Sequence, residues 1–175
     1  MKKLLTFLAL TVLVALASTG KTSAQAYENG RNYLNVGIGL GTYGGGGLGF
    51  GGSFEHGFTD AISAGAIVGY SSGNYGYIGS DYRFTFLNFG VRGSYHFAEL
   101  LNIGNNKLDP YAGLGLGYRV YGDNFSGTGY NRAYGSGIFF MGHVGARYFF
   151  SDNVGGYAEL GAGFATLQLG ITLKF

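Results

Sequence analysis

The last nine residues of the chain alternate strictly between two kinds of side chain. From Leu167 to Phe175, every odd position is large and apolar, and every even position is polar or glycine. Successive side chains of a β-strand point to opposite faces, so this segment predicts a strand with one apolar face and one small or polar face. The ring of Phe175 ends the strand where a membrane interface is expected.

The same alternation recurs along the rest of the chain. Most of the segments are close to the length that a tilted strand needs to cross a bilayer. The sequence has 36 glycines and one proline, and each glycine would cost about 1 kcal/mol inside a helix, so the pattern favours an all-β fold. The predicted strands lie at about residues 32–41, 48–56, 61–70, 83–97, 113–120, 137–150, 154–161 and 167–175.

The charged side chains share a face with the glycines, while the opposite face of each strand is apolar. A soluble barrel of the lipocalin or streptavidin type, which is the rival architecture, would carry its charges outside. A strand edge exposed to lipid would leave backbone groups unpaired, so the sheet must close. We therefore predict an all-β fold, an eight-stranded antiparallel up-and-down transmembrane β-barrel.

The lumen of an eight-stranded barrel is just wide enough to be filled by side chains. Buried charges need partners, and we expect Glu159 to pair with Arg92 or Arg119 across the barrel. A structural network is favoured over a proton or ion pathway. The predicted polar network of the lumen consists of Glu55, Arg92, Arg119, His143, Arg147, Glu159 and Lys174.

The first 26 residues have the pattern of a secretory signal peptide. Lys2 and Lys3 precede an uncharged apolar run, and Ala24-Gln25-Ala26 supplies an A-x-A cleavage site. We expect residues 1–26 to be removed, which leaves one barrel domain at 27–175; a second A-x-A site at Ala15 to Ala17 keeps the position of the cut open. The chain has no cysteine, so we expect neither a lipoprotein anchor nor disulfides.

Without that leader the chain is nearly neutral. Eight Lys and Arg remain, since three of the eleven are Lys2, Lys3 and Lys21, against nine Asp and Glu, for a net charge of −1. Nucleic acid is therefore not expected as a partner. The three histidines lack metal-ligand spacing, and no cofactor is expected.

Several segments resemble the small OmpA-type and OmpX-like outer-membrane β-barrels of Gram-negative bacteria. The resemblance implies a place in the cell outer membrane, the lipid bilayer as a partner, and insertion by the barrel-assembly machinery. It also implies that Phe175, Leu173 and Ile171 form the assembly signal at the end of the last strand. It implies no shared reaction. The matching segments are 54–60, 90–97, 109–118, 145–150 and the terminal strand.

The function expected from these features is a structural or surface-interaction role at the cell envelope, by a monomer. The alternatives are a narrow porin-like transporter of small or hydrophobic solutes and a rim enzyme acting on lipid. An enzyme is not expected, because Ser94 and His96 lie on the same strand instead of facing each other across a mouth.

Two segments are long enough to be outer loops, residues 71–82 and 122–136. They are rich in Gly, Ser, Asn and Tyr, a composition that suits both solvated turns and adaptable binding surfaces. An extracellular or envelope ligand is expected here if anywhere. The residues expected to contact it are Tyr75, Tyr77, Tyr130, Arg132 and Tyr134.

Overall fold

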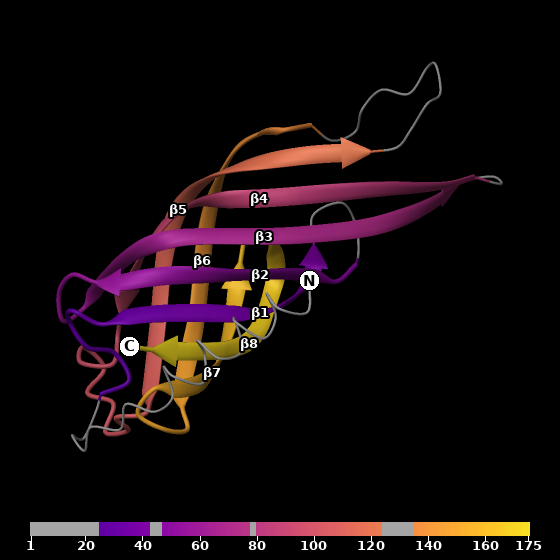
Figure 1. The fold of residues 1–175 in the computed structure, drawn as a ribbon. Coiled ribbons are helices and arrows are strands. Elements are labelled where there is room, and N and C mark those ends of the chain that lie inside the picture. The colour runs from indigo at the N-terminus through magenta and orange to yellow at the C-terminus, as the bar shows by residue number, and fades with distance from the viewer. Residues whose placement is uncertain (1–24, 43–46, 78–79, 124–134) are drawn as a thin grey trace, which may run out of the picture.

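The computed structural model describes residues 25–42, 47–77, 80–123 and 135–175, and for residues 74–77, 80–82 and 123 it describes the main chain alone. Each of its eight strands is antiparallel to the next, and β1 pairs with β8 to close the barrel (Figure 1). The predicted fold class is confirmed. The strands are β1 (Asn32–Thr42), β2 (Gly49–Gly57), β3 (Ile62–Tyr77), β4 (Ser80–His96), β5 (Leu108–Asp123), β6 (Gly137–Phe149), β7 (Val154–Gly161) and β8 (Ala165–Lys174).

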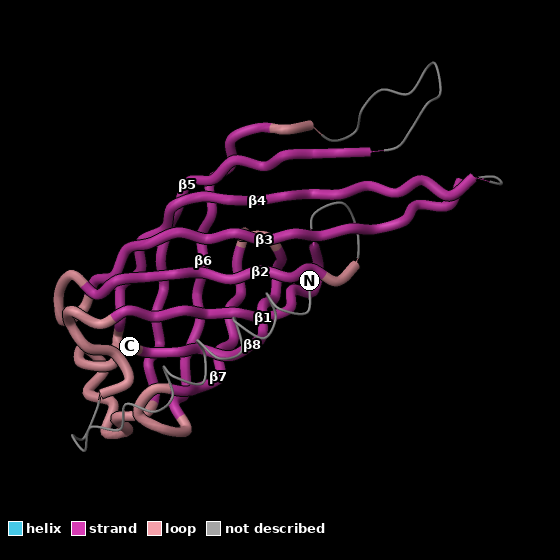
Figure 2. Tube along the Cα trace, viewed as in Figure 1, coloured by secondary structure: helices cyan, strands magenta, loops and turns pink. Residues whose placement is uncertain are grey.

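The two ends of the barrel differ in the height of its wall. Strands β3, β4 and β5 project well beyond the others at one end (Figure 2). At the opposite end lie Gln25, Phe175 and the connections after β2, β4 and β6. Outer-membrane barrels carry their longer extensions on the extracellular side, and the projecting strands are the longest extension here. We therefore refer to the end with Gln25 and Phe175 as the inner end.

One predicted loop is in fact a hairpin. β3 and β4 stay paired from Ile62 opposite Tyr95 to Tyr77 opposite Ser80, so residues 71–77 and 80–82 are its two arms. The prediction of a loop at 71–82 was wrong because Gly, Ser and Asn were interpreted as turn residues, although they are paired strand residues here. Tyr75 and Tyr77 thus lie on β3, and Tyr130, Arg132 and Tyr134 lie outside the described residues.

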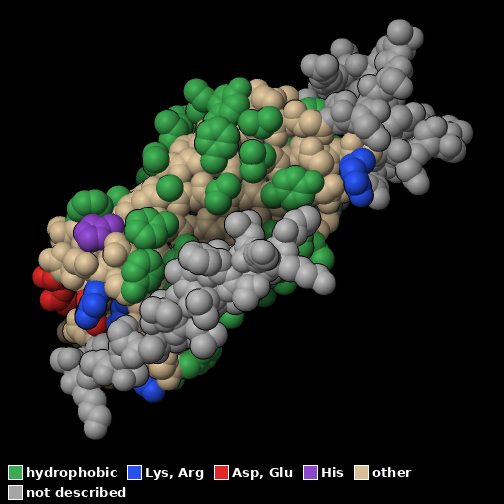
Figure 3. All heavy atoms as spheres, in the orientation of Figure 1, with side chains coloured by type: hydrophobic (Ala, Val, Ile, Leu, Met, Phe, Trp, Pro, Cys, Tyr) green, Lys and Arg blue, Asp and Glu red, His purple; other side chains and the backbone are tan. Residues whose placement is uncertain are grey.

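The outward face of the wall is apolar. Val91, Leu114 and Phe140 are 63%, 76% and 83% exposed, and apolar side chains cover the middle of the barrel while charges gather towards its ends (Figure 3). Aromatic pairs such as Phe54 with Phe175 lie near the inner end. An outward apolar band flanked by aromatic residues is the surface that a bilayer solvates. Among the described residues, no helix is long and apolar enough to cross a membrane.

The alternation predicted a lumen lined with polar residues and glycine, but the observed lumen is polar only in part. Ile67, Met141, Phe164 and Ala165 form a buried apolar cluster, and Phe139 packs against it. Ile67 and Met141 lie on strand positions that face inward, where the sequence pattern predicted small or polar residues. The connected ion pairs of Glu55, Arg92, Arg147 and Glu159 therefore lie on the inner side of this cluster.

Phe164 fills the lumen from the short connection between β7 and β8. Its side chain is 1% exposed and lies against inward-facing glycines of β1, β2 and β3. A methyl group on Gly39, Gly51 or Gly69 would overlap the Phe164 ring. Glycine is needed at these positions because the ring occupies the space that their side chains would fill.

We predict that Phe164→Ala destabilises the barrel by about 3–5 kcal/mol, the usual effect of emptying a buried aromatic site. Unfolding in urea, followed by the gel mobility of unboiled samples, measures the change. Phe140→Ala is the matched control, because the Phe140 ring points outward and is 83% exposed. Equal effects of the two substitutions would contradict the packing described for Phe164.

Candidate functional site

Arg92 joins two carboxylates in the centre of the polar part of the lumen. Its Nη1 and Nη2 atoms donate to Oε1 and Oε2 of Glu159 at 3.0 and 2.6 Å, and its Nε lies 2.8 Å from Oε1 of Glu55. The Tyr111 hydroxyl donates to Glu159 Oε2 at 2.9 Å. Arg92 comes from β4, Glu55 from β2 and Glu159 from β7, so the contacts cross the barrel. A bidentate pair of this kind is the strongest form of the arginine–carboxylate interaction.

A second arginine, Arg147 of β6, is fully buried nearer the inner end. It donates to Asp109 Oδ2 at 3.2 Å, to Glu55 Oε2 at 3.1 Å and to Asn35 Oδ1 at 3.3 Å. Its guanidinium also lies 4.5 Å from the centre of the Tyr111 ring. The Tyr33 ring centre lies 5.0 Å away, so this buried cation has both carboxylate and aromatic partners, as burial of a charge requires.

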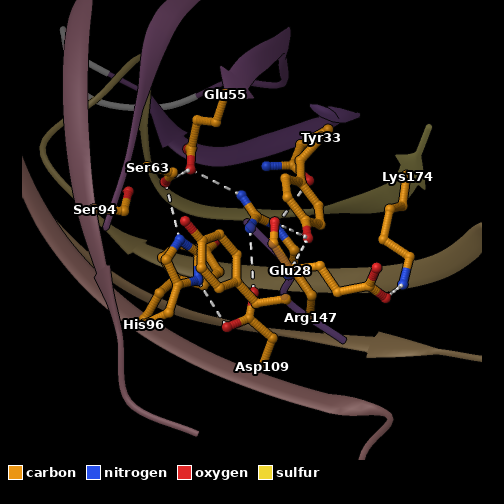
Figure 4. A network of polar contacts seen from close by, with 12 residues as sticks. Glu28, Tyr33, Glu55, Ser63, Ser94, His96, Asp109, Arg147 and Lys174 are labelled. Atoms are coloured by element: carbon orange, nitrogen blue, oxygen red, sulfur yellow. Dashed lines mark hydrogen bonds and ion pairs between the residues drawn. The ribbon is translucent and has the colours of Figure 1, made fainter. Parts of the chain in front are cut away.

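His96 links the two sides of this arrangement (Figure 4). Its Nδ1 lies 2.8 Å from Asp109 Oδ1, and its Nε2 lies 2.9 Å from Ser63 Oγ. The Ser63 hydroxyl in turn donates to Glu55 Oε2 at 2.8 Å. With Arg147, which contacts both Asp109 and Glu55, these residues of β2 to β6 close a ring of hydrogen bonds inside the lumen.

The positions of the protons in this ring follow from its donors and acceptors. The hydroxyl proton of Ser63 points to Glu55, because an ionised carboxylate can only accept. The proton between Ser63 and His96 is therefore assigned to Nε2. Arg92 and Arg147 are the cations that pair with the three carboxylates of Glu55, Asp109 and Glu159.

Tyr27 covers the inner end of the network. Its ring stacks on His96 with 3.5 Å between ring centres, and its hydroxyl donates to the carbonyl oxygen of Thr59 at 2.9 Å. Burial, followed by the charges of Asp109 and Glu55, raises the pKa of Tyr27 to about 12, so the hydroxyl keeps its proton. The segment before β1 thus closes the lumen at this end.

A polar hollow of about 650 Å³ lies beside Tyr27, between the segment before β1 and the connection from β4 to β5. Its walls include Glu28, Asp60 and Glu99 together with several asparagines. Among the described residues, no three histidine, cysteine or carboxylate side chains are grouped so that they could hold a metal ion. The hollow lies at the inner mouth, and it reaches the network at His96, which shares its wall with Tyr27.

The seven side chains expected in one lumen network are distributed over several places. Glu55, Arg92, Arg147 and Glu159 are joined, and Arg92 is the partner of Glu159. The other three lie apart from them. Arg119 donates to Asn88 Oδ1 at 2.6 Å and lies over the Phe139 ring, His143 contacts Ser94 at 2.9 Å, and Lys174 lies at the inner mouth.

Asp109, Ser63 and Tyr111 are network members that the sequence analysis did not select. Asp109 and Tyr111 were placed in a connection, because the fifth strand was predicted to begin at Gly113, whereas β5 begins at Leu108. Strand alternation could have identified both residues as inward-facing, since Asp109 and Tyr111 lie in phase with the inward-facing Gly113 and Arg119. Ser63 is small and uncharged, and it gave no signal of its own.

The residues expected to form the assembly signal lie on the outer side of β8. Ile171 is 57% exposed, Phe175 is 44% exposed, and Leu173 lies in the same phase of the strand. The main chain of Phe175 exchanges two hydrogen bonds with Asn32 of β1, at 2.8 and 3.0 Å. The last strand is thus paired on both sides, and its recognition by the assembly machinery remains a prediction.

A closed eight-stranded barrel with an apolar outer wall and paired charges inside defines the class of small transmembrane β-barrels. Solved structures of outer-membrane proteins have the same fold. OprG from Pseudomonas aeruginosa is 12% identical over 89% of this chain and 99% of its own, with a TM-score of 0.68. Ail of Yersinia pestis is 16% identical over 85% of this chain and all of its own, with a TM-score of 0.52.

The sequence matches no protein-family model and no curated protein. The chain has the fold of small outer-membrane barrels, as the resemblance in its sequence implied, and this fold supports a location in the bacterial outer membrane. At these identities the likeness extends to the fold and not to an activity.

We predict that Glu159→Ala lowers the free energy of unfolding by about 3–5 kcal/mol, because it removes a carboxylate that binds the buried Arg92. The temperature at which the barrel loses its fast mobility on a gel measures the loss. Replacing both partners, Arg92→Met with Glu159→Met, should recover part of it, since no unpaired charge remains. Glu99→Ala, at an exposed site of the inner mouth, is the control. An unchanged transition in Glu159→Ala would contradict the network.

Proposed function

We propose that this protein is an integral outer-membrane barrel with a structural or surface-interaction role at the cell envelope. The observation that carries the proposal is the combination of a lumen filled across its width with a hairpin that projects beyond the barrel wall (Figure 1). Such a molecule offers its outer end, rather than a pore, to other molecules.

The filled lumen argues against the alternative of a narrow porin-like transporter. A solute passing inward would have to part Arg92 from Glu159, and Arg147 from Asp109 and Glu55, and all five side chains are at most 3% exposed. It would also have to displace Phe164 above the network and Tyr27 below it. Separating buried, hydrogen-bonded ion pairs is costly.

In planar lipid bilayers we expect the purified wild-type barrel to give no stepwise conductance. A large-pore porin reconstituted in the same way is the positive control for insertion, and heat-modifiable mobility shows that the barrel under test is folded. Reproducible single-channel steps from the folded wild type would contradict a closed lumen and favour the transporter.

A rim enzyme would need an accessible nucleophile. The structure contains a Ser–His–Asp chain of contacts, but its serine is not available to act as one. Ser63, His96 and Asp109 are connected as in a hydrolase triad, yet Ser63 is 0% exposed and its proton points to Glu55. Because His96 Nε2 donates to Ser63, it cannot take a proton from that hydroxyl. We therefore propose that the protein is not an enzyme and that these residues serve the structure.

We assign the surface role to the β3–β4 hairpin and to residues 124–134, which lie outside the described residues. Residues 73–77 and 80–84 of the hairpin lie beyond the last pairing of β2 with β3, so one side of this ribbon has no neighbouring strand within the described residues. Ail has been crystallised with the heparin analogue sucrose octasulfate. Sulfated glycans are therefore the first ligands that we propose to test.

Deleting residues 73–77 and 80–84 removes five facing pairs of the hairpin and keeps the register, since Ser72 still faces Thr85. We expect this deletion to abolish adhesion of cells that display the barrel to immobilised heparin, while the barrel still shows heat-modifiable mobility. The control is Phe58→Ala in the inner turn, which should leave adhesion unchanged. If the deletion variant binds as well as the wild type, the hairpin is not the binding surface.

A further inference from the structure

Residues 25 and 26 are part of the barrel, although the A-x-A pattern assigns them to the leader. Ala26 is 3% exposed and packs in one buried cluster with Tyr27, Tyr33 and Phe149. Tyr33 belongs to β1 and Phe149 to β6, so this cluster ties the segment before β1 to opposite sides of the inner mouth. A residue that is discarded would have no reason to fit this site.

Lys174 of β8 gives the second observation. Its Nζ donates to the main-chain oxygen of Gln25 at 2.7 Å and to Glu28 Oε1 at 2.9 Å, and it lies 5.2 Å from the centre of the Phe149 ring. The Lys174 side chain is only 6% exposed. A nearly buried ammonium needs acceptors for its protons, and Gln25 supplies one of the two described here.

A cut after Ala26 would damage this arrangement in two ways. It would remove the carbonyl of Gln25 and the buried methyl group of Ala26. It would also place a new α-ammonium group, charged near neutral pH, on Tyr27 in the mouth that already holds the Lys174 ammonium. Two like charges in one mouth repel each other.

We propose that the leader is cut between Ala24 and Gln25, and that the new N-terminal glutamine then closes to pyroglutamate. This inference depends on the signal peptide expected from the sequence. The bond between Ala24 and Gln25 follows Thr22 and Ala24 at the third and first positions before the cut. Both residues are small, as the peptidase requires.

The cyclisation needs no oxidant and no cofactor. The α-amino nitrogen of Gln25 attacks Cδ of its own side-chain amide, a C–N bond forms, the bond from Cδ to the amide nitrogen breaks, and ammonia leaves. The product is a neutral lactam, so the α-ammonium charge is lost. The main-chain oxygen of Gln25 is untouched and still accepts the hydrogen bond from Lys174. The modified terminus can therefore close the mouth without adding a second cation.

Mass spectrometry of the protein extracted from the outer membrane of a Gram-negative host tests the proposal. Trypsin cuts after Arg31, so the proposed terminus gives the peptide 25–31 with a mass lower than its sequence by one ammonia. A first peptide of 27–31 would overturn the proposal. A peptide 22–31 would do so too, because it arises if the chain is cut after Ala17 or is not cut. Peptide 25–31 with its full mass would overturn the cyclisation.

Two matched substitutions show which bond the peptidase cuts, Ala24–Gln25 or Ala26–Tyr27. Neither test depends on whether the product folds. Thr22→Phe alters only the proposed site, and we expect the uncut precursor to accumulate. Ala26→Phe alters only the residue before the rival bond, and we expect cutting to continue and to yield peptide 25–31 with phenylalanine at position 26. The reverse pattern would overturn the proposal.

A third variant tests the ring closure. Gln25→Ser should be cut at the same bond but retain its full peptide mass, because serine has no amide to expel. Loss of ammonia from the Gln25→Ser peptide would show that the mass change arises elsewhere.

Discussion

The buried ion pairs across the lumen are the interaction on which the rest of the structure depends. Arg92 and Arg147 each hold carboxylates from strands that are distant in the sequence. Charged groups can occupy so narrow a space only if every one of them is paired. The network thus joins strands that face one another across the barrel, and it also closes the lumen.

Around this core the usual arrangement of a soluble protein is inverted. Apolar side chains cover the outer wall, while the charges and glycines lie inside. Glycine and large side chains are complementary within the lumen: Gly39, Gly51 and Gly69 leave room for Phe164, and Gly113 leaves room for His143. The high glycine content is therefore a packing requirement of a barrel that is filled by a few long side chains.

The sequence predicted the strands that alternate without interruption, and it failed where alternation and composition disagree. The last strand was predicted within two residues, because its apolar face is continuous from Leu167 to Phe175. The arms of the β3–β4 hairpin were mistaken for a loop, since Gly, Ser and Asn occur in both. Phe164 gave no signal, because it lies in a turn, and only the fold shows that it enters the lumen.

The candidate site was predicted in part for a similar reason. Inward charges such as Arg92 and Glu159 follow from strand phase, but which partner each one takes depends on the closure of the barrel and on the stagger of its strands. Asp109 lay beyond the predicted start of its strand, although its phase was correct. Contacts of uncharged residues such as Ser63 depend on atomic positions that no sequence pattern specifies.

The central claim is that the apolar wall faces lipid, and single-cysteine spin labelling tests it directly, because the chain has no cysteine of its own. Labels at Val91→Cys and Leu114→Cys, in barrels reconstituted in bilayers, should collide with dissolved oxygen and be protected from a water-soluble nickel complex. A label at Phe58→Cys, in the exposed inner turn, should show the opposite preference. Strong nickel contact at Val91 and Leu114 would contradict the account.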